Sequence, residues 1–160
     1  YDLTVYFYNP NVHPKEEYEK RRQETIKLCK EFKIDFIEGE YNSEDWFAWA
    51  KEYAEEREGG ERCRKCFAMR LGQTAKFASE NNFDIFASTL TSGRNKPADV
   101  INPLGEEMAK KYGVEFLAED WKKKGRQEKS LQVCKTKDIY RQHYCGCIYS
   151  LRESKEQKTD

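Results

Sequence analysis

The sequence lacks long hydrophobic runs, carries no net charge and contains only two histidines. Its mean hydropathy is −1.02, and no stretch reaches the roughly 20 apolar residues that a membrane-spanning helix needs. It also has no signal-peptide pattern, so we expect a cytoplasmic protein with no membrane partner. The 29 Lys and Arg residues balance the 29 Asp and Glu residues. Only local basic patches, and not the overall charge, can therefore favour nucleic-acid binding.

Short β-rich runs alternate with segments of helical pattern along the chain. We expect strands at 3–9, 34–41, 83–90 and 114–120, and helices at 14–32, 43–57, 62–82 and 98–113, with Ser43 as an N-cap. This alternation predicts an α/β, Rossmann-like fold with a mainly parallel sheet and helices on both faces. The length of 160 residues fits one domain, which we expect at residues 1–152, followed by a polar C-terminal tail at 153–160. The loops at 9–14, 91–97 and 121–125 should lie at the carboxyl edge of the sheet, where functional loops gather.

The six cysteines are not arranged as in a secreted disulfide scaffold, which is usually shorter and rich in loops. Four of them form two close pairs, Cys63-x-x-Cys66 and Cys145-Gly-Cys147. Close pairs in a cytoplasmic protein indicate metal binding or redox chemistry. Cys29 and Cys134 share helical faces with apolar residues, and we interpret both as buried core residues.

The C-x-x-C spacing lets two thiolates at a helix start face one ion. It suits zinc, an iron–sulfur cluster or a thioredoxin-type dithiol. Thioredoxin-type motifs usually follow a strand directly, whereas a Gly-Gly loop precedes Cys63. We therefore prefer Cys63 and Cys66 as metal ligands.

The C-G-C pair allows two interpretations. It can chelate a metal, or it can close a very small and strained disulfide ring, and strained disulfides are easily reduced. Gly146 removes the Cβ that would obstruct such a turn. Either all four paired cysteines hold one metal centre, or one pair holds metal while Cys145 and Cys147 cycle between dithiol and disulfide.

Several segments resemble, in order, the cobalamin-independent epoxyqueuosine reductases (QueH). They are "YFYNPNVHPKEEYEKRR", "EGEY", "GGERCRKCFAMRL", "STLTSGRNK", "INPLGEEMAKKYGVEF" and "YRQHYCGCIYS". The resemblance implies a fold similar to nucleotide α-hydrolase-like domains, with residues 1–152 as the reductase domain. It implies an oxidoreductase of tRNA processing and queuosine biosynthesis, which reduces epoxyqueuosine to queuosine at the wobble position.

The same resemblance implies the cofactor and the site residues. It implies a [4Fe-4S] cluster, with room for an additional iron ion. Cys63 and Cys66 match cluster ligands of the family, and Cys145 and Cys147 match its redox-active disulfide. The family has a further N-terminal strand with an adjacent Cys-Cys pair that completes the cluster. This sequence starts where the second strand of the family would, so we expect a truncated form with two of the four ligands.

The implied partners are tRNA carrying epoxyqueuosine and an unidentified electron donor. Local basic clusters could bind tRNA phosphates, and Tyr140 or Tyr144 could stack on a splayed base. The clusters are Arg94 with Lys96, Lys122 to Lys124 with Arg126, and Arg62 with Arg64 and Lys65. The proton donor is open among Tyr140, His143, Tyr144 and Asp99. As lone loop residues, His13 and His143 are expected to be solvated, and neither is assigned to a metal.

Two other functions remain open from the sequence. A zinc-binding module for RNA or protein would use all four paired cysteines on one ion. A thiol–disulfide oxidoreductase acting on proteins would work without any metal.

Overall fold

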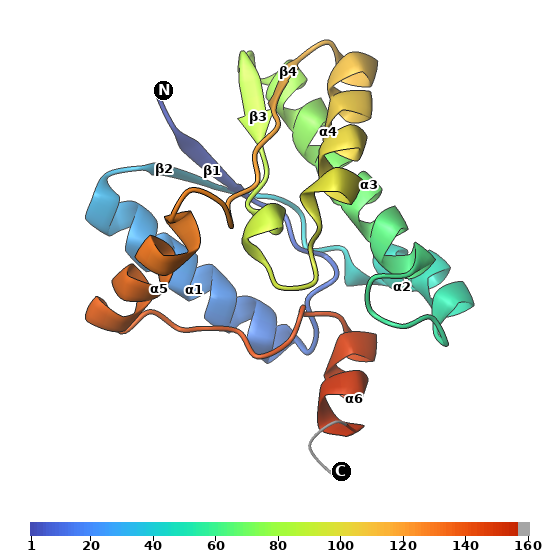
Figure 1. Ribbon diagram of the computed structural model, residues 1–160. Coiled ribbons are helices and arrows are strands. Elements are labelled where there is room, and N and C mark those ends of the chain that lie inside the picture. Colours follow the sequence, from blue (N-terminus) through green and yellow to red (C-terminus); the bar gives the residue numbers. More distant parts are fainter. Residues whose placement is uncertain (157–160) are drawn as a thin grey trace. The chain divides into compact units, whose positions relative to one another are not determined.

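The computed structural model describes residues 1–156 and divides into two compact units (Figure 1). Unit 1 comprises Tyr1–Arg57 together with the segment from Lys137 onward, and unit 2 comprises Glu58–Thr136. No helix among the described residues is long and apolar enough to cross a membrane. The C-G-C motif belongs to unit 1 and the C-x-x-C motif belongs to unit 2.

Unit 1 is built on one pair of parallel strands. Its elements are β1 (Thr4–Phe7), α1 (Lys15–Phe32), β2 (Asp35–Glu38), α2 (Ser43–Ala50), the 3-10 turn η1 (Lys51–Tyr53) and α6 (Ile148–Glu156). The strand register runs from Thr4 opposite Asp35 to Phe7 opposite Glu38. Phe7, Val12 and Tyr18 form a small core between the strands and α1. Since each parallel strand needs a long crossover, α1 lies in sequence between the two.

The helix starts of unit 1 follow capping chemistry, with one difference from the sequence prediction. Pro14 precedes α1, and Glu16 and Glu17 occupy its first turn, where carboxylates oppose the helix dipole. The expected N-cap of α2 was Ser43, which is wrong. Asn42 is the cap, because its side chain accepts a hydrogen bond from the Asp45 amide at 3.3 Å.

Unit 2 has its own parallel pair and a larger core. Its elements are α3 (Glu61–Glu80), β3 (Ile85–Ala87), the 3-10 turn η2 (Leu90–Ser92), α4 (Ala98–Tyr112), β4 (Glu115–Leu117) and α5 (Arg126–Thr136). β3 and β4 pair with Phe86 opposite Phe116. The core joins α3, β3 and α4 through apolar residues that include Phe67, Leu71 and Ile101. Gly105 lets Phe116 approach α4 closely, because a Cβ there would lie 2.3 Å from the Phe116 ring.

The α/β class with parallel strand pairing is confirmed. The strands are shorter than the expected ranges, and within residues 1–156 they form two separate two-stranded sheets. Residues 153–156, expected in the polar tail, belong to α6, and the rest of that tail lies outside the described residues. The single domain at 1–152 stays a prediction.

Candidate active site

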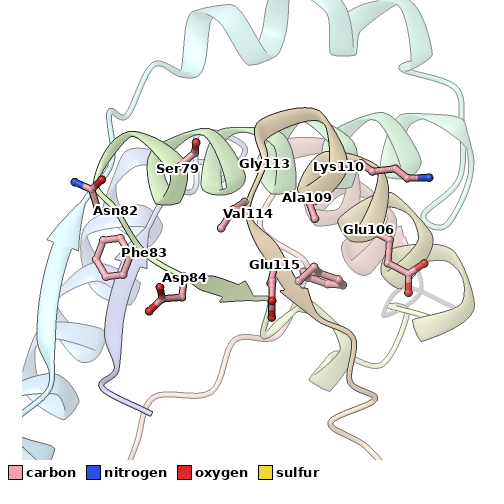
Figure 2. A pocket seen from close by; sticks show the side chains of 11 residues that line it. Ser79, Asn82, Phe83, Asp84, Glu106, Ala109, Lys110, Gly113, Val114 and Glu115 are labelled. Atoms are coloured by element: carbon pink, nitrogen blue, oxygen red, sulfur yellow. The ribbon is translucent and has the colours of Figure 1, made fainter.

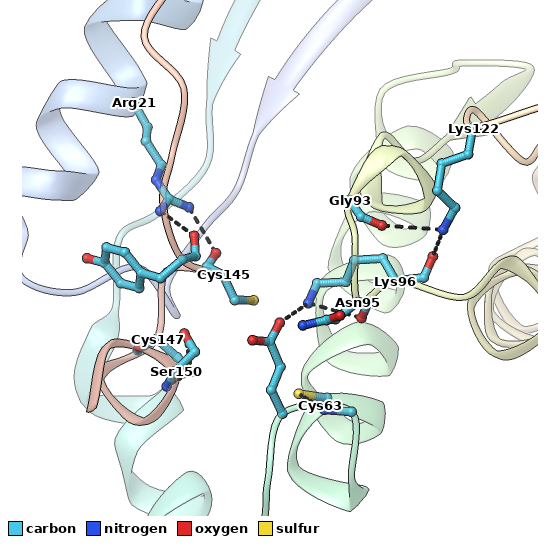
Figure 3. Close-up of polar contacts among 12 residues, drawn as sticks. Arg21, Cys63, Gly93, Asn95, Lys96, Lys122, Cys145, Cys147 and Ser150 are labelled. Carbon is cyan, nitrogen blue, oxygen red and sulfur yellow. Dashed lines mark hydrogen bonds and ion pairs between the residues drawn. The ribbon is translucent and has the colours of Figure 1, made fainter. Parts of the chain in front are cut away.

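The backbone around Cys145 is held by a side chain from α1. We call residues Tyr144–Cys147 the CGC turn. Arg21 donates two hydrogen bonds to it, from Nη1 to the Cys145 carbonyl at 2.9 Å and from Nη2 to the Tyr144 carbonyl at 3.1 Å (Figure 3). A planar guanidinium suits two acceptors at fixed spacing. Arg21 therefore fixes the orientation of two successive peptide groups.

Arg21 is itself fixed by Glu17, one helical turn earlier. Its Nε donates to the Glu17 carboxylate at 2.8 Å, and the Tyr140 hydroxyl donates to both oxygens of that carboxylate at 3.0 and 2.9 Å. Burial, followed by this carboxylate, raises the pKa of Tyr140. The Lys20 ammonium lies 3.8 Å from the centre of the Tyr140 ring. Tyr140, expected to stack on a base or donate a proton, thus has both its hydroxyl and one ring face in internal contacts.

The loop after β1 contacts the same turn from another direction. The His13 amide donates to the Gly146 carbonyl at 2.7 Å, and the Tyr144 hydroxyl donates to the His13 carbonyl. Burial is the main reason why the pKa of Tyr144 is raised to about 12. The carbonyls of all three residues before Cys147 in the CGC turn are therefore occupied by fixed donors.

His13 is buried, so the expectation of a solvated histidine is wrong. Only 7% of His13 is exposed, and its ring lies against Phe47 and Trp46, with centroids 4.2 and 5.4 Å away. Its Nδ1 lies 2.8 Å from the Asn11 carbonyl, which can only accept, so Nδ1 carries the proton. Nε2 has no hydrogen-bond partner among the described residues. Burial lowers the pKa of His13, with the Asn11 bond acting against it. His143, by contrast, is exposed as expected.

Gly146 is required by both conformation and space. Its φ is +127°, a region that residues with a side chain avoid. A Cβ there would lie 2.8 Å from Arg21 Nη1 and 3.0 Å from Val12 Cγ2. The glycine between the two cysteines thus admits both the turn and the arginine that holds it.

The two cysteines of the turn differ in environment, and neither is in a disulfide. Cys147 is buried and directly precedes α6. Its sulfur accepts from the Ser150 amide at 3.4 Å and lies 3.5 Å from the Ser150 hydroxyl. Cys145 is partly exposed. Cys147 is therefore the buried thiol of the pair, and Cys145 is the more exposed one.

In unit 2, Cys63 and Cys66 lie in the first two turns of α3, both buried. Their separation of three residues puts both on one face of the helix. The Gly59 amide donates to the Cys63 sulfur at 3.2 Å, a contact that favours negative charge on sulfur. Within residues 1–156, no cluster of three or more His, Cys, Asp or Glu side chains is placed to hold a metal. Two buried thiols on one face of α3 thus have the residue type and spacing that suit a pair of metal ligands.

Next to this helix start, a buried lysine holds the loop after β3. Lys96, expected at a basic surface, donates to Glu58 at 3.0 Å (Figure 3), and its ammonium lies 5.3 Å from the centre of the Phe67 ring. Its side chain is 8% exposed. The expectation of a surface cation is therefore wrong for Lys96, whose charge joins the loop to the segment just before α3.

The loops after β3 and β4 are also joined to each other. The buried Thr91 hydroxyl donates to the Glu119 carbonyl at 2.8 Å, and the Trp121 indole donates to the Ser88 carbonyl at 2.7 Å. The Lys122 ammonium donates to the carbonyls of Lys96 and Gly93 at 2.8 and 3.3 Å. These loops follow the carboxyl ends of their strands, as expected.

Not all predicted basic residues face solvent. Arg62 is buried, and Lys122 donates to backbone carbonyls. Five others are exposed: Arg64, Lys65, Arg94, Lys123 and Lys124. Arg126 pairs with Glu119 at 2.8 Å, and this contact is the main cause that lowers the pKa of Glu119. Asp99, a candidate proton donor, is exposed in the first turn of α4.

The two remaining cysteines, Cys29 and Cys134, differ in burial. Cys29 is buried on α1, as predicted, and burial raises its pKa. Cys134 was expected to be a core residue, which is wrong because it is only partly buried. Its helix α5 is polar and contributes no buried residue.

A hollow of about 820 Å³ in unit 2 is not part of the site (Figure 2). It lies at the amino ends of β3 and β4, and Asp84, Glu106 and Glu115 line it together with Lys110. Ligands of open α/β sheets bind at the carboxyl ends instead, and this excess of carboxylates repels phosphate.

Sequence reasoning missed Arg21 and Glu17. Their spacing of four residues suggests only an ordinary helical ion pair. The two carbonyls that Arg21 binds in the CGC turn lie more than a hundred positions away, with a separation of 124 residues for Cys145. No local pattern indicates such a contact.

The chain is therefore an α/β protein with a C-x-x-C motif at the start of a helix. Its C-G-C turn has a backbone fixed by hydrogen bonds from Arg21 and His13. The family model described as "Epoxyqueuosine reductase QueH" matches residues 1–153, and the chain belongs to this family.

Curated proteins with this name are similar over nearly the whole chain. One from Histophilus somni (strain 129Pt) is 41% identical over 154 residues, which are 96% of this chain and 63% of the relative. One from Streptococcus pyogenes serotype M1 is 41% identical over 94% of this chain and 62% of the relative. One from Thermotoga maritima is 35% identical over 99% of this chain and 84% of the relative. The chain thus spans somewhat less than two thirds of the first two.

Proposed function

We propose that this chain is the reductase part of an enzyme that converts epoxyqueuosine to queuosine in tRNA. Family membership over residues 1–153 supports the reaction. The observation that carries the proposal is the CGC turn, in which Arg21 and His13 hold the backbone while both thiols remain free. As a tRNA-modifying enzyme the protein would work in the cytoplasm, as one domain over residues 1–152.

The cysteine pair matches the electron count of the reaction. Converting an epoxide to an alkene consumes two electrons and two protons and releases the oxygen as water. The dithiol of Cys145 and Cys147 supplies both electrons and both protons when it closes to a disulfide. A fixed backbone lowers the entropy cost of bringing the two sulfurs together.

Cys63 and Cys66 would hold the metal group that the family implies. Two buried thiolates on one face of α3, one of them accepting the Gly59 amide, fit two positions of a [4Fe-4S] cluster. When bound, such a cluster relays electrons singly, and an open iron or an additional iron ion polarises oxygen. The ion pair between Lys96 and Glu58 would hold the neighbouring loop against the helix start that carries both ligands.

Exposed cations of unit 2 would bind the tRNA backbone. Lys123 and Lys124 are exposed on the loop after β4, and Arg94 is exposed on the loop after β3. Both loops follow the carboxyl ends of strands, where ligands of α/β sheets bind. Phosphate contacts of this kind give affinity that falls as salt rises.

The proposal is tested by purifying the chain without oxygen and measuring iron, sulfide and zinc. We expect iron and sulfide when the N-terminal Cys-Cys segment that the family resemblance implies is joined to the chain, and their loss from that form in Cys63→Ser and Cys66→Ser, with Cys134→Ser as the matched control. A colourless protein that holds zinc on all four paired cysteines would instead support the binding-module hypothesis, because ligand type alone allows either metal.

The reaction itself is tested with tRNA carrying epoxyqueuosine and a chemical reductant, followed by nucleoside analysis. We expect queuosine to form with wild type. Cys145→Ser and Cys147→Ser should keep the iron and lose the product. If either variant forms queuosine at the wild-type rate, the cysteine pair is not the source of electrons.

A further inference from the structure

The two thiols of the CGC turn differ in their access to solvent. Cys147 is 6% exposed, whereas Cys145 is partly exposed. In thiol–disulfide exchange the attacking thiol must reach one particular sulfur along the S–S axis, so access decides which sulfur is attacked. The difference in exposure therefore divides the roles of the two cysteines.

Cys147 is buried at the start of α6, where its carbonyl and its sulfur both accept hydrogen bonds from helix amides. Its carbonyl accepts from the Leu151 amide at 3.1 Å, the first bond of the helix, and its sulfur accepts from the Ser150 amide at 3.4 Å. This is the pattern of an N-cap residue, with sulfur in place of the usual oxygen. An amide that points at the sulfur stabilises negative charge on it, as does the helix start. Cys147 is thus suited to leave as a thiolate when the disulfide opens.

Cys145 differs from Cys147 in which of its atoms are fixed by hydrogen bonds. Its carbonyl is fixed by Arg21, and its side chain is directed away from the guanidinium (Figure 3). Within residues 1–156 its sulfur makes no hydrogen bond. The backbone of Cys145 is therefore held while its sulfur stays accessible.

We propose that the electron donor of this site is a small thiol or a protein dithiol, and that it attacks Cys145, with Cys147 as the leaving sulfur. This inference rests on the proposed redox role of the pair. The donor thiolate forms a bond to the Cys145 sulfur, the S–S bond breaks, and its electron pair and then a proton go to Cys147. A second donor thiol attacks the mixed disulfide, is oxidised with the first to a disulfide, and releases Cys145 as a thiol. Two electrons and two protons thus enter for each disulfide opened.

The first test uses the wild-type chain, purified without oxygen, and follows alkylation by iodoacetamide with peptide mass mapping. Both cysteines lie on one tryptic peptide, residues 142–152, so fragment ions must locate the label, and we expect Cys145 to be alkylated at least about ten-fold faster than Cys147. The buried Cys29 provides an internal reference for a protected thiol. Equal rates, or faster labelling of Cys147, would overturn the assignment without any variant being made.

The second test traps the mixed disulfide with glutathione. Cys147→Ser, incubated with glutathione disulfide, should accumulate glutathione on Cys145, whereas Cys145→Ser should carry little on Cys147. Adding Ser150→Ala to Cys145→Ser should speed labelling of Cys147 several-fold, since it removes a neighbouring side chain. Ser154→Ala is the matched control, because its hydroxyl donates to the Leu151 carbonyl further along the same helix.

The outcomes separate this inference from the proposed function. If queuosine forms but glutathione accumulates on Cys147, the roles of the two sulfurs are reversed and the inference is wrong. If Cys145 is trapped but no queuosine forms under any condition, the division of roles stands and the proposed reaction is wrong.

Discussion

The amide of His13 donates a hydrogen bond to the carbonyl of Gly146, with N and O 2.7 Å apart. Through this bond the loop after β1 and the CGC turn, 133 positions apart by residue number, share one backbone contact. The His13 ring is meanwhile buried against Phe47 and Trp46, with its proton on Nδ1. A buried imidazole with an unpartnered Nε2 costs stability, and its neutral form is favoured.

We predict that His13 makes stability fall in mild acid. Because burial lowers the pKa of His13 below its usual 6.5, the unfolded chain binds a proton that the folded chain does not. This contribution is complete above about pH 6.5 and is lost as the pH falls toward the lowered value. His13→Asn keeps a donor near Nδ1 and removes the titration. The measurement is chemical denaturation at several pH values, with a difference of at most about 1.4 kcal/mol per pH unit.

The only other histidine provides the control. His143 is exposed, so His143→Asn should keep the wild-type dependence on pH. If His13→Asn and wild type lose stability in parallel between about pH 7 and pH 5, His13 is not responsible.

A second prediction concerns Gly146→Ala. The added methyl group would meet Arg21 and Val12 at 2.8 and 3.0 Å, at a φ of +127°. We expect a loss of about 2–4 kcal/mol, from backbone strain and from the displaced guanidinium. Gly125→Ala separates the two causes, because its φ is +72° with no atom within 4 Å of the added group. Urea denaturation should show a loss of about 1 kcal/mol for that control, and equal losses would show that the contact with Arg21 contributes nothing.

Sequence patterns were sufficient for the elements and for the two cysteine motifs. Alternating β-rich and helical segments predicted each strand and most helices, because hydrophobic periodicity is a local property. The patterns failed where a residue's environment depends on distant chain segments. Lys96 looks like a surface cation until Glu58 and Phe67 are placed around it, and His13 looks solvated until α2 covers it.

A third prediction tests the geometry of Arg21 apart from its charge. Arg21→Lys keeps the cation but cannot donate to two carbonyls and a carboxylate in one plane. We expect a loss of about 1–3 kcal/mol in stability and a fall of about ten- to hundred-fold in turnover, because the cysteine turn is displaced. Arg22→Lys is the matched control on α1, since Arg22 bonds Glu38 and does not contact the turn. If Arg21→Lys and Arg22→Lys lose stability and turnover equally, the two hydrogen bonds from Arg21 to the turn contribute nothing specific.

The last prediction separates structural from tRNA-binding lysines on the loop after β4. Lys122 donates to the carbonyls of Gly93 and Lys96. Lys122→Met should therefore lower the stability of unit 2 by about 1–2 kcal/mol and leave the salt dependence of tRNA binding nearly unchanged. Lys123 is 77% exposed, and its ammonium lies 3.7 Å from the Asp120 carboxylate. Lys123→Met and Lys124→Met should each lower the salt slope by roughly one unit and change stability by less than about 0.5 kcal/mol. Filter binding over a range of salt concentrations, beside urea denaturation of each variant, measures both quantities. A salt slope that falls equally for all three lysines would mean that Lys122 leaves its carbonyl partners and joins the phosphate contacts.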